Sequence, residues 1–544
     1  MFYSFLGSDI PLNFNIIMKF TCLTLILLST LTFTANSHNY DFKIVPKPSH
    51  IEPAKSSFVV RDAMLVWLDP IAALSKDYVT FLLGDTGIAA GYTSKKNKAD
   101  IILKIDKTIS FDSPEAYSLV VRASKIIATA NDGRGLHYAL QTLRQLALKH
   151  GNQVVIPGCT ITDYPAFQWR SFHFDESRHF HGMFLAKTML NEMARLKMNI
   201  FHWHLTDDAA WRIEINKYPL LTDLGAKRDH SFSHLSPEEW DKRFPQRSYY
   251  TQDEIKDIVT YAEERGIQVI PEIEMPGHAS AAIYAYPWMG SSSAGADQPV
   301  WADLLNVTDP RVEQFLKDVL DEVVELFPSR IIHIGGDEAV YSHWENNQQI
   351  RSFMKENNIP TYMDLQVRFI NRMSNYLASK GCRTIGWNEI TGDNIREEKH
   401  IQSSRNEKLA AGTIVQFWDG NPSLINKALS KGYDIVNSYR FYTYLDYPYE
   451  VTSLEKAYSF NLIPEGISEE NKVKILGTGC QSWSEGIPNA NKLFYQVFPR
   501  IAAHAETGWT PYSKKNYNNF RYRFTTIENQ WKKLGFIGSQ VHKY

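Results

Sequence analysis

Cysteine is scarce in this chain of 544 residues, which holds only Cys22, Cys159, Cys382 and Cys480. The four are far apart, and no CxxC pair or Cys/His ligand spacing occurs. This excludes a disulfide framework and a cysteine-based metal site, although one disulfide is possible. The chain also lacks an excess of charge, with 58 Lys and Arg against 60 Asp and Glu. No basic stripe stands out, which argues against nucleic acid as a partner.

Long apolar runs are lacking as well, apart from one near the N-terminus. Residues 20–35 are apolar with some Thr and Ser, follow Met18-Lys19, and end at Ala35-Asn36-Ser37. This pattern predicts a signal peptide over residues 1–37, with Met18 as an alternative start. The run is short for a membrane helix of about 20 residues, so no stable membrane span is expected. Export to a periplasm, the medium or a lysosome-like compartment is expected.

What is present is a long alternation of apolar runs and helical patterns. Residues 38–160 are interpreted as a small α/β accessory domain, with strands at 101–105, 117–121 and 125–130 and a helix at 135–149. Asp163-Tyr164-Pro165 marks a boundary, and residues 161–510 follow as a parallel α/β domain. A C-terminal helical segment is expected over 511–544.

Eight strands are expected in the larger domain, which predicts a (β/α)8 TIM barrel in an α/β protein. Thr251 with Glu254 is typical of a capping box, and Asp309-Pro310 of a capped helix start. The expected strands cover residues 169–174, 199–205, 268–273, 331–334, 383–387, 413–418, 434–437 and 476–483.

The most informative stretch is Gly335-Gly336-Asp337-Glu338, which ends the apolar run 331–334. Neighbouring side chains in a strand point to opposite faces, but two glycines let the backbone leave strand geometry. Asp337 and Glu338 could then share one pocket at the carboxyl end of a barrel strand, where catalytic groups gather. Two adjacent acids favour divergent pKa values. An Asp that caps the next helix, with a solvated Glu beside it, is the alternative.

Acids and tryptophans end most of the other expected strands too. Such a set predicts a polar pocket walled by aromatic rings, the form expected of a carbohydrate site. The strand ends carry Asp175 with Arg178-His179, Asp207-Asp208, Glu272, Glu274 and His278, Trp387-Asn388-Glu389, Trp418-Asp419, Tyr444-Leu445-Asp446 and Trp483-Ser484-Glu485.

His202 and His204 allow a competing hypothesis, a metal-dependent barrel hydrolase. A His-x-His pair lies on one face of a strand and binds metal in some barrel hydrolases. Such sites need ligands on later strands, and the fifth and sixth expected strands hold no histidine. Buried, hydrogen-bonded histidines are therefore favoured.

Four motifs together resemble the β-N-acetylhexosaminidases of glycoside hydrolase family 20. They are Trp203-His204-Leu205-Thr206-Asp207-Asp208, Pro276-Gly277-His278, His333-Ile334-Gly335-Gly336-Asp337-Glu338 and Trp483-Ser484-Glu485. Residues 44–48 and 138–143 are similar to the accessory N-terminal domain of that family. The resemblance covers most of the chain after residue 37.

The resemblance implies an exo-acting β-N-acetylhexosaminidase that uses substrate-assisted, retaining hydrolysis. The 2-acetamido oxygen of the substrate attacks the anomeric carbon and gives an oxazolinium intermediate. Glu338 matches the general acid/base, Asp337 the group that orients and stabilises the acetamido N–H, and Tyr444 the hydroxyl that holds the acetamido oxygen.

Further matches concern binding of terminal N-acetylhexosamine on an oligosaccharide or glycoconjugate. Arg170 resembles the arginine that grips the 3- and 4-hydroxyls, and Asp446 and Glu485 the acids on the outer hydroxyls. Asp207 and His278 resemble a pair that tunes the acid/base, and Trp387, Trp418 and Trp483 would wall the pocket. The resemblance implies no metal and no organic cofactor, and some relatives form homodimers.

The chain also departs from the family pattern. Glu274 replaces a more usual Asp, Ala209-Ala210 a common Gln-Gly, and Ser171 a usual Gly, while Thr507 interrupts a familiar run near Glu506. These changes leave pH tuning and linkage preference open. A sugar-binding barrel without turnover is the non-enzymatic alternative, although the intact Asp337-Glu338 pair argues against it.

Overall fold

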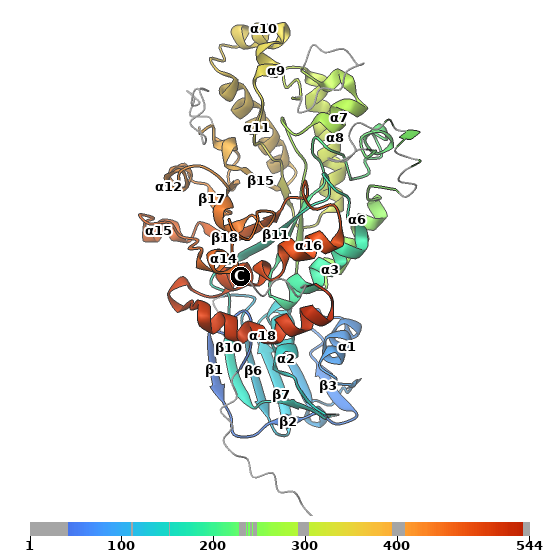
Figure 1. Ribbon diagram of the computed structural model, residues 1–544, viewed down its shortest axis with the longest axis vertical. Helices are drawn as coiled ribbons and strands as arrows, with labels where there is room; N and C mark the ends of the chain where they lie inside the picture. The colour runs from blue at the N-terminus through green and yellow to red at the C-terminus, as the bar shows by residue number, and fades with distance from the viewer. Residues whose placement is uncertain are drawn as a thin grey trace, which may run out of the picture. The chain divides into compact units, whose positions relative to one another are not determined.

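The computed structural model describes residues 42–109, 113–151, 153–227, 247–291, 304–393 and 408–536, together with 236, 238, 239 and 242 (Figure 1). The expected signal peptide lies outside these residues. Within them no helix combines the length and the apolar character needed to cross a membrane. Cys159, Cys382 and Cys480 are buried free thiols.

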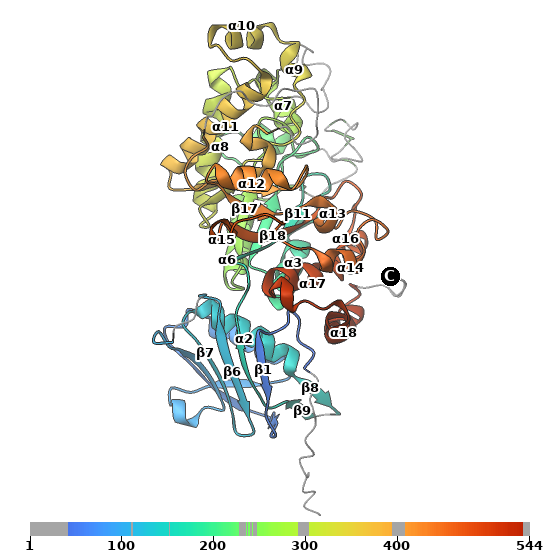
Figure 2. The same ribbon diagram turned by 90° about the vertical axis from the view of Figure 1, so that its left-hand side faces the viewer.

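The N-terminal region forms a seven-stranded sheet with the order β1-β10-β6-β7-β5-β3-β4 and a three-stranded sheet β2-β9-β8. Helix α2 (Gly133–Leu146) lies against β5, β6 and β7 (Figure 2). The strands are β1 (His50–Pro53), β2 (Phe58–Val59), β3 (Met64–Leu68), β4 (Ala90–Tyr92), β5 (Ile101–Ile105), β6 (Tyr117–Arg122), β7 (Lys125–Ala130), β8 (Leu148–His150), β9 (Gln153–Ile156) and β10 (Cys159–Asp163), and α1 spans Lys76–Asp85.

Helix α2 shows why this region folds as it does. The Asp132 side chain accepts a hydrogen bond from the Arg134 N–H and caps the helix start, as aspartate does well. Leu136, Leu140 and Leu143 are buried in the apolar cluster of the sheet. The helix was expected to reach residue 149 but ends at Leu146, because Leu148–His150 pairs with β9.

Eight parallel strands form a closed barrel, which confirms the expected fold class. Every expected strand is present within two residues of its expected bounds, and β11 pairs with β18 to close the ring. The barrel strands are β11 (Trp169–Asp175), β12 (Ile200–His204), β13 (Gln268–Glu272), β14 (Ile331–His333), β15 (Arg383–Trp387), β16 (Ile414–Phe417), β17 (Asp434–Asn437) and β18 (Ile475–Ser482).

Helices connect the barrel strands and lie outside them (Figures 1 and 2). Thr251 and Glu254 form the expected capping box of α6, and the Asp309 side chain caps α8 with Pro310 at its first position. The helices are α3 (Gly182–Arg195), α4 (Leu220–Asp223), α6 (Gln252–Glu263), α7 (Ser280–Ala285), α8 (Pro310–Leu326), α9 (Ser342–Glu345), α10 (Gln348–Glu356), α11 (Tyr362–Ser379), α12 (Ser423–Ser430), α13 (Arg440–Thr443), α14 (Leu454–Ser459), α15 (Glu469–Lys472), α16 (Ala490–Val497), α17 (Arg500–Trp509) and α18 (Tyr517–Lys533).

The two ends of the barrel interior differ in chemistry. Near the strand starts it is filled by an apolar cluster that includes Trp169, Ile200, Ile414 and Leu476. Apolar side chains close that end, so a polar site can open only at the carboxyl ends of the strands, as is usual for this fold.

Buried charges join the N-terminal sheet to the barrel. The Lys197 ammonium lies 2.8 Å from the Asp163 carboxylate of β10, and both side chains are fully buried. Arg170 of β11 pairs with Glu115 at 2.9 Å. The Trp509 indole N–H at the end of α17 donates to Asp163 at 2.9 Å. Each buried charge is thus paired across the junction, as burial requires.

Candidate active site

A pocket of 360 Å³ opens at the carboxyl ends of the barrel strands. Carboxylates, aromatic rings and one arginine meet there, which is the polar, aromatic-walled site expected from the sequence. Its walls are Arg178, His278, Asp337, Glu338, Trp418, Tyr444, Asp446, Tyr447, Trp483, Glu485, Gly486 and Ile487.

Asp337 and Glu338 share the pocket because the chain turns sharply after β14. Gly335 and Gly336 have φ of +61° and +92°, a region that glycine adopts without strain. A Cβ on Gly335 would lie 1.6 Å from the Glu274 carboxylate, so any other residue there would have to displace that side chain and adopt a strained φ. Glu338 itself has φ of +47°. The Asp337 side chain is buried at 10% exposure, whereas that of Glu338 is 39% exposed.

Burial changes the charge of Asp337. It raises the pKa of Asp337 to about 7, with His278 opposing the rise and Glu338 adding to it. Among the described residues, the Asp337 Oδ1 atom has no hydrogen-bond partner. A buried acceptor without a donor is costly, so this oxygen is set to receive an N–H from a bound molecule.

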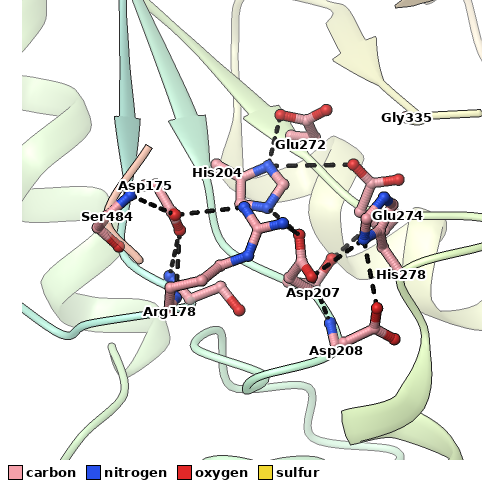
Figure 3. Close-up of polar contacts among 12 residues, drawn as sticks. Asp175, Arg178, His204, Asp207, Asp208, Glu272, Glu274, His278, Gly335 and Ser484 are labelled. Atoms are coloured by element: carbon pink, nitrogen blue, oxygen red, sulfur yellow. Dashed lines mark hydrogen bonds and ion pairs between the residues drawn. The ribbon is translucent and has the colours of Figure 1, made fainter. Parts of the chain in front are cut away.

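His278 lies between Asp207 on one side and the two acids, Asp337 and Glu338, on the other. Its Nδ1 is 3.2 Å from Asp207 Oδ1 (Figure 3). Its Nε2 is 3.5 Å from Glu338 and 3.6 Å from Asp337. Burial alone would lower the pKa of His278, but Asp207 and Asp337 raise it well above its ordinary value. The structure therefore brings together Asp207, His278, Asp337 and Glu338, as the resemblance implies.

Arg178, and not Arg170, is the arginine of the pocket. Arg170 is the second residue of β11, so it lies at the apolar end of the barrel, fully buried against Glu115. The expectation that Arg170 binds sugar is wrong. Arg170 lies at the start of its strand, whereas the pocket lies at the opposite, carboxyl ends of the strands, and the strand length separates the two.

Several acids hold the Arg178 guanidinium in the pocket wall. Its Nη2 atom lies 2.7 Å from Asp207, and its Nη1 atom lies 3.3 Å from Asp175 (Figure 3). Nη2 is also 3.6 Å from Glu485. Asp175 is itself held by the Ser484 N–H at 2.9 Å. The guanidinium also covers the Trp483 ring at 4.9 Å. Such a fixed fork is suited to two adjacent hydroxyls.

Aromatic rings form one side of the pocket. Trp418 and Tyr444 are stacked, with ring centroids 6.1 Å apart and planes at 10°, and Trp483 lies 6.1 Å from Tyr444. Trp387 is completely buried beneath them and donates to Glu272 at 2.7 Å. Trp418, Trp483 and Tyr444 are thus wall residues, whereas Trp387 supports the floor.

Asp446 and Glu485 lie in the pocket, as the resemblance implies, and Arg178 lies there beside them. Burial raises the pKa of Asp446 to about 7, and Glu485 adds to the rise. Its Oδ1 atom has no partner among the described residues. This oxygen is available to a ligand hydroxyl.

The barrel interior below the pocket holds a cluster that the sequence did not reveal as a whole. Glu272 is fully buried, and four histidines from three strands lie against it at 2.6 to 3.6 Å: His173, His202, His204 and His333. His202 and His204 are buried, as favoured from the sequence. Glu272 with His202 and His333, or with His173 and His204, has the spacing of a metal-ligand group.

Strand register gives the signal by which these residues could have been found. Asp175 pairs with His204, His204 with Glu272, and Glu272 with His333 across neighbouring strands. The sequence shows each residue but not this register. Arg178 was visible directly after the first strand, while Tyr447 carried no signal of its own.

Comparisons with known proteins agree with this arrangement. The model described as "Glycosyl hydrolase family 20, catalytic domain" matches residues 167–512, and "Glycosyl hydrolase family 20, domain 2" matches residues 41–164. A "Beta-hexosaminidase" of Vibrio furnissii is 32% identical over 485 residues, covering 86% of this chain and 76% of that protein. One from Porphyromonas gingivalis is 31% identical, and the match covers 92% of this chain and 64% of that protein.

Solved structures are similar over nearly the whole chain. The β-N-acetylhexosaminidase of Bacteroides fragilis has a TM-score of 0.76 and 30% identity, covering 91% of this chain and 96% of that one. The "GH20 Exo beta-N-Acetylglucosaminidase" of Vibrio harveyi, solved with N-acetylglucosamine, has a TM-score of 0.77 and 29% identity, covering 91% and 78%.

Proposed function

The chain belongs to glycosyl hydrolase family 20, and from that premise we propose that it is an exo-acting β-N-acetylhexosaminidase. It releases terminal non-reducing N-acetylglucosamine or N-acetylgalactosamine from β-linked glycans. The observation that carries the proposal is the placement of Asp337 and Glu338, adjacent in the chain and both lining one pocket.

Adjacent acids suit a reaction in which the substrate supplies the nucleophile. An ordinary retaining glycosidase places its two carboxyls on opposite sides of the sugar, about 5 Å apart. Here Glu338 donates its proton to the leaving oxygen while the 2-acetamido oxygen bonds to the anomeric carbon. Glu338 then takes a proton from the water that opens the oxazolinium, and configuration is retained.

Asp337 and Tyr444 serve the acetamido group. The unpartnered Asp337 Oδ1 accepts the acetamido N–H, and the carboxylate offsets the positive charge that develops on the oxazolinium. The Tyr444 hydroxyl holds the acetamido oxygen for attack. Tyr444, Trp418 and Trp483 surround the methyl group and the apolar face of the sugar.

Arg178, Asp446 and Glu485 support exo action. These charged groups line the pocket and offer partners to the outer hydroxyls of one sugar ring. Arg178 and Glu485 lie 3.6 Å apart in this wall, which supports binding of one terminal sugar ring there.

The test is hydrolysis of a chromogenic N-acetyl-β-glucosaminide by the protein and by Glu338→Gln. We expect the variant to lose about 100- to 10,000-fold in kcat, as for loss of a general acid, with an unchanged melting midpoint. Near-normal turnover by Glu338→Gln would refute the role of Glu338. A wild-type protein without turnover would favour the alternative of a non-catalytic sugar-binding barrel. Paired gluco- and galacto-configured substrates and chitobiose establish specificity.

Substrate assistance has its own test. We expect a thiazoline mimic of the oxazolinium to bind at least about 100-fold more tightly than N-acetylglucosamine, because Asp337 and Tyr444 flank the acetamido group. A mimic that bound no better than the free sugar would refute the mechanism.

A chelator tests the metal-dependent alternative. The histidines and Glu272 have metal-like spacing, but both nitrogens of His204 already face carboxylates. We expect full activity after dialysis against EDTA, and activity restored only by added metal would favour the metal hydrolase.

Export and assembly stay predictions. The apolar run 20–35 after Lys19 supports a cleaved leader. N-terminal sequencing of protein from fractionated cells would identify cleavage near residue 37 and the compartment. Sedimentation would test the homodimer that the resemblance allows.

A further inference from the structure

His204 lies in the barrel interior between two carboxylates. Its Nδ1 is 2.6 Å from Glu272 Oε2, and its Nε2 is 2.8 Å from Asp207 Oδ2 (Figure 3). A carboxylate only accepts hydrogen bonds, so each ring nitrogen must carry a hydrogen to bond its partner. This geometry is that of an imidazolium and not of a neutral tautomer.

Glu272 depends on this charge. Its other oxygen accepts the Trp387 indole N–H at 2.7 Å. His333 Nδ1 lies 2.9 Å away but receives the Gly335 N–H, so it cannot also donate to Glu272. Burial lowers the pKa of His173 to about 3 and of His333 to about 4, which leaves both rings neutral. His202 Nε2 also lies 2.9 Å from Glu272 Oε2, but of the four histidines it is His204 that faces a carboxylate at each ring nitrogen. This makes His204 the cation that balances the fully buried Glu272 carboxylate.

Asp207 depends on His204 as well. Its Oδ2 atom contacts His204 at 2.8 Å and Arg178 at 2.7 Å, which leaves Oδ1 directed at His278, 3.2 Å away. His278 in turn lies 3.6 Å from Asp337 and opposes the rise in the Asp337 pKa. An unbroken line of charged groups thus connects the barrel interior to the acid that receives the acetamido group.

We propose that His204 is a fixed imidazolium that acts as a positioning residue for the active site. Clamped by Glu272, it joins Arg178 in keeping Asp207 ionised and aimed at His278, so that His278 stays charged beside Asp337 and favours the ionised form of that carboxyl. This role rests on the proposed function, because it acts on the group that stabilises the oxazolinium.

Removing the charge is expected to shift the pH dependence of the reaction. In His204→Gln, Asp207 holds a proton more readily and His278 loses charge, so the pKa of Asp337 rises. Asp337 must be ionised to act, so the acid limb of kcat/KM moves to higher pH, by about one unit. Around His204 and His278 the facing groups are Asp175, Arg178, Asp208 and Glu274, with His173, His202 and His333 of the Glu272 cluster. Around Asp337 they are Glu272, Glu274, Glu338 and Tyr444.

Two matched variants separate positioning from packing. His173→Gln removes another buried histidine, 3.6 Å from Glu272, and should leave the acid limb in place. In His204→Gln/Glu272→Gln the uncompensated carboxylate is gone, so the melting midpoint should recover relative to His204→Gln while the acid limb stays shifted. The proposal would be overturned if the acid limb of kcat/KM in His204→Gln matched that of the wild type. It would also be overturned if His204→Gln/Glu272→Gln restored the wild-type acid limb.

The charge state of His204 is tested without any substrate. In a 15N-histidine NMR spectrum of the wild-type protein at pH 8, we expect an imidazolium with a hydrogen on each ring nitrogen, assigned by its loss in His204→Gln. A neutral ring at pH 8 would overturn the proposal, whatever the protein hydrolyses. An imidazolium in a protein without turnover would refute the proposed function and leave the charge assignment standing.

Discussion

Replacing Asp337 by asparagine is expected to stabilise the protein above neutral pH and to abolish turnover. The Asp337 side chain is only 10% exposed. Burial raises its pKa to about 7, so the ionised form is unfavourable in the fold. Asparagine has nearly the same shape and carries no charge, so the exchange removes the ionisation and leaves the packing in place.

The magnitude follows from the difference between the folded and unfolded pKa values. With a pKa of about 7 in the fold and an ordinary 3.8 in the unfolded chain, Asp337 binds its proton more tightly when folded. Stability therefore falls as pH rises from about 4 to 7, by about 4 kcal/mol in all. Asparagine avoids this loss, so its advantage is about 1 kcal/mol at pH 4.5 and about 4 kcal/mol at pH 8.

Differential scanning calorimetry at the two pH values is the assay. For a chain of this size, 4 kcal/mol corresponds to a rise of about 4 °C in the melting midpoint. Asp207→Asn is the matched control with the opposite sign. Burial would raise the pKa of Asp207, but Arg178 and His278 hold it well below its ordinary value. Its ionised form stabilises the fold at pH 8, so the control should melt earlier there.

The reasoning fails if Asp337→Asn melts at or below the wild-type temperature at pH 8, or if its advantage does not grow between pH 4.5 and pH 8. The chromogenic assay on the same samples should show the stabilised variant to be nearly inactive. The ionised carboxylate of Asp337 would then lower the stability of the fold while being required for activity, a trade-off known at other functional sites.

Three further outcomes follow from the pocket. Arg178→Lys should raise KM at least about tenfold, because one ammonium cannot reproduce the guanidinium contacts. Arg170→Lys should instead lower the free energy of unfolding by about 2 kcal/mol or more and leave KM unchanged. Steady-state kinetics and melting of both variants check this. Gly335→Ala should lose both stability and activity, since its Cβ would lie 1.6 Å from Glu274 at a φ of +61°; equal melting and turnover would contradict it. Asp446→Asn should raise KM yet melt higher at pH 8, because burial raises the pKa of Asp446 to about 7, as calorimetry and kinetics can measure.

Much of the barrel could be predicted because its strands are local signals. Each is a short apolar run that ends in glycine or a polar residue, and a helical pattern follows most of them. The N-terminal sheet was harder, since β3 alternates buried and exposed positions only briefly, β4 is three half-buried residues, and α1 went unrecognised. Those elements depend on partners distant in the sequence.

The site was predictable where its residues adjoin in the chain. Asp337 and Glu338 follow one strand, and the Asp207 and His278 motifs follow two others. Arg170 was misplaced because strand direction, which puts a first residue at the closed end, was not applied to it. The charges around Glu272 needed register between strands, which one sequence does not display.

The buried charges at the junction mean that the catalytic barrel cannot be excised as an independent unit. Without the N-terminal sheet, Lys197 and Arg170 would lose Asp163 and Glu115, and Trp509 would lose its acceptor. A truncated barrel would leave both cations without their carboxylates and would expose Trp509, which packs in the apolar cluster of the sheet. The N-terminal sheet contributes no residue to the pocket lining, yet the barrel needs it to fold. Its removal should therefore make the protein insoluble, and activity would be lost as a consequence.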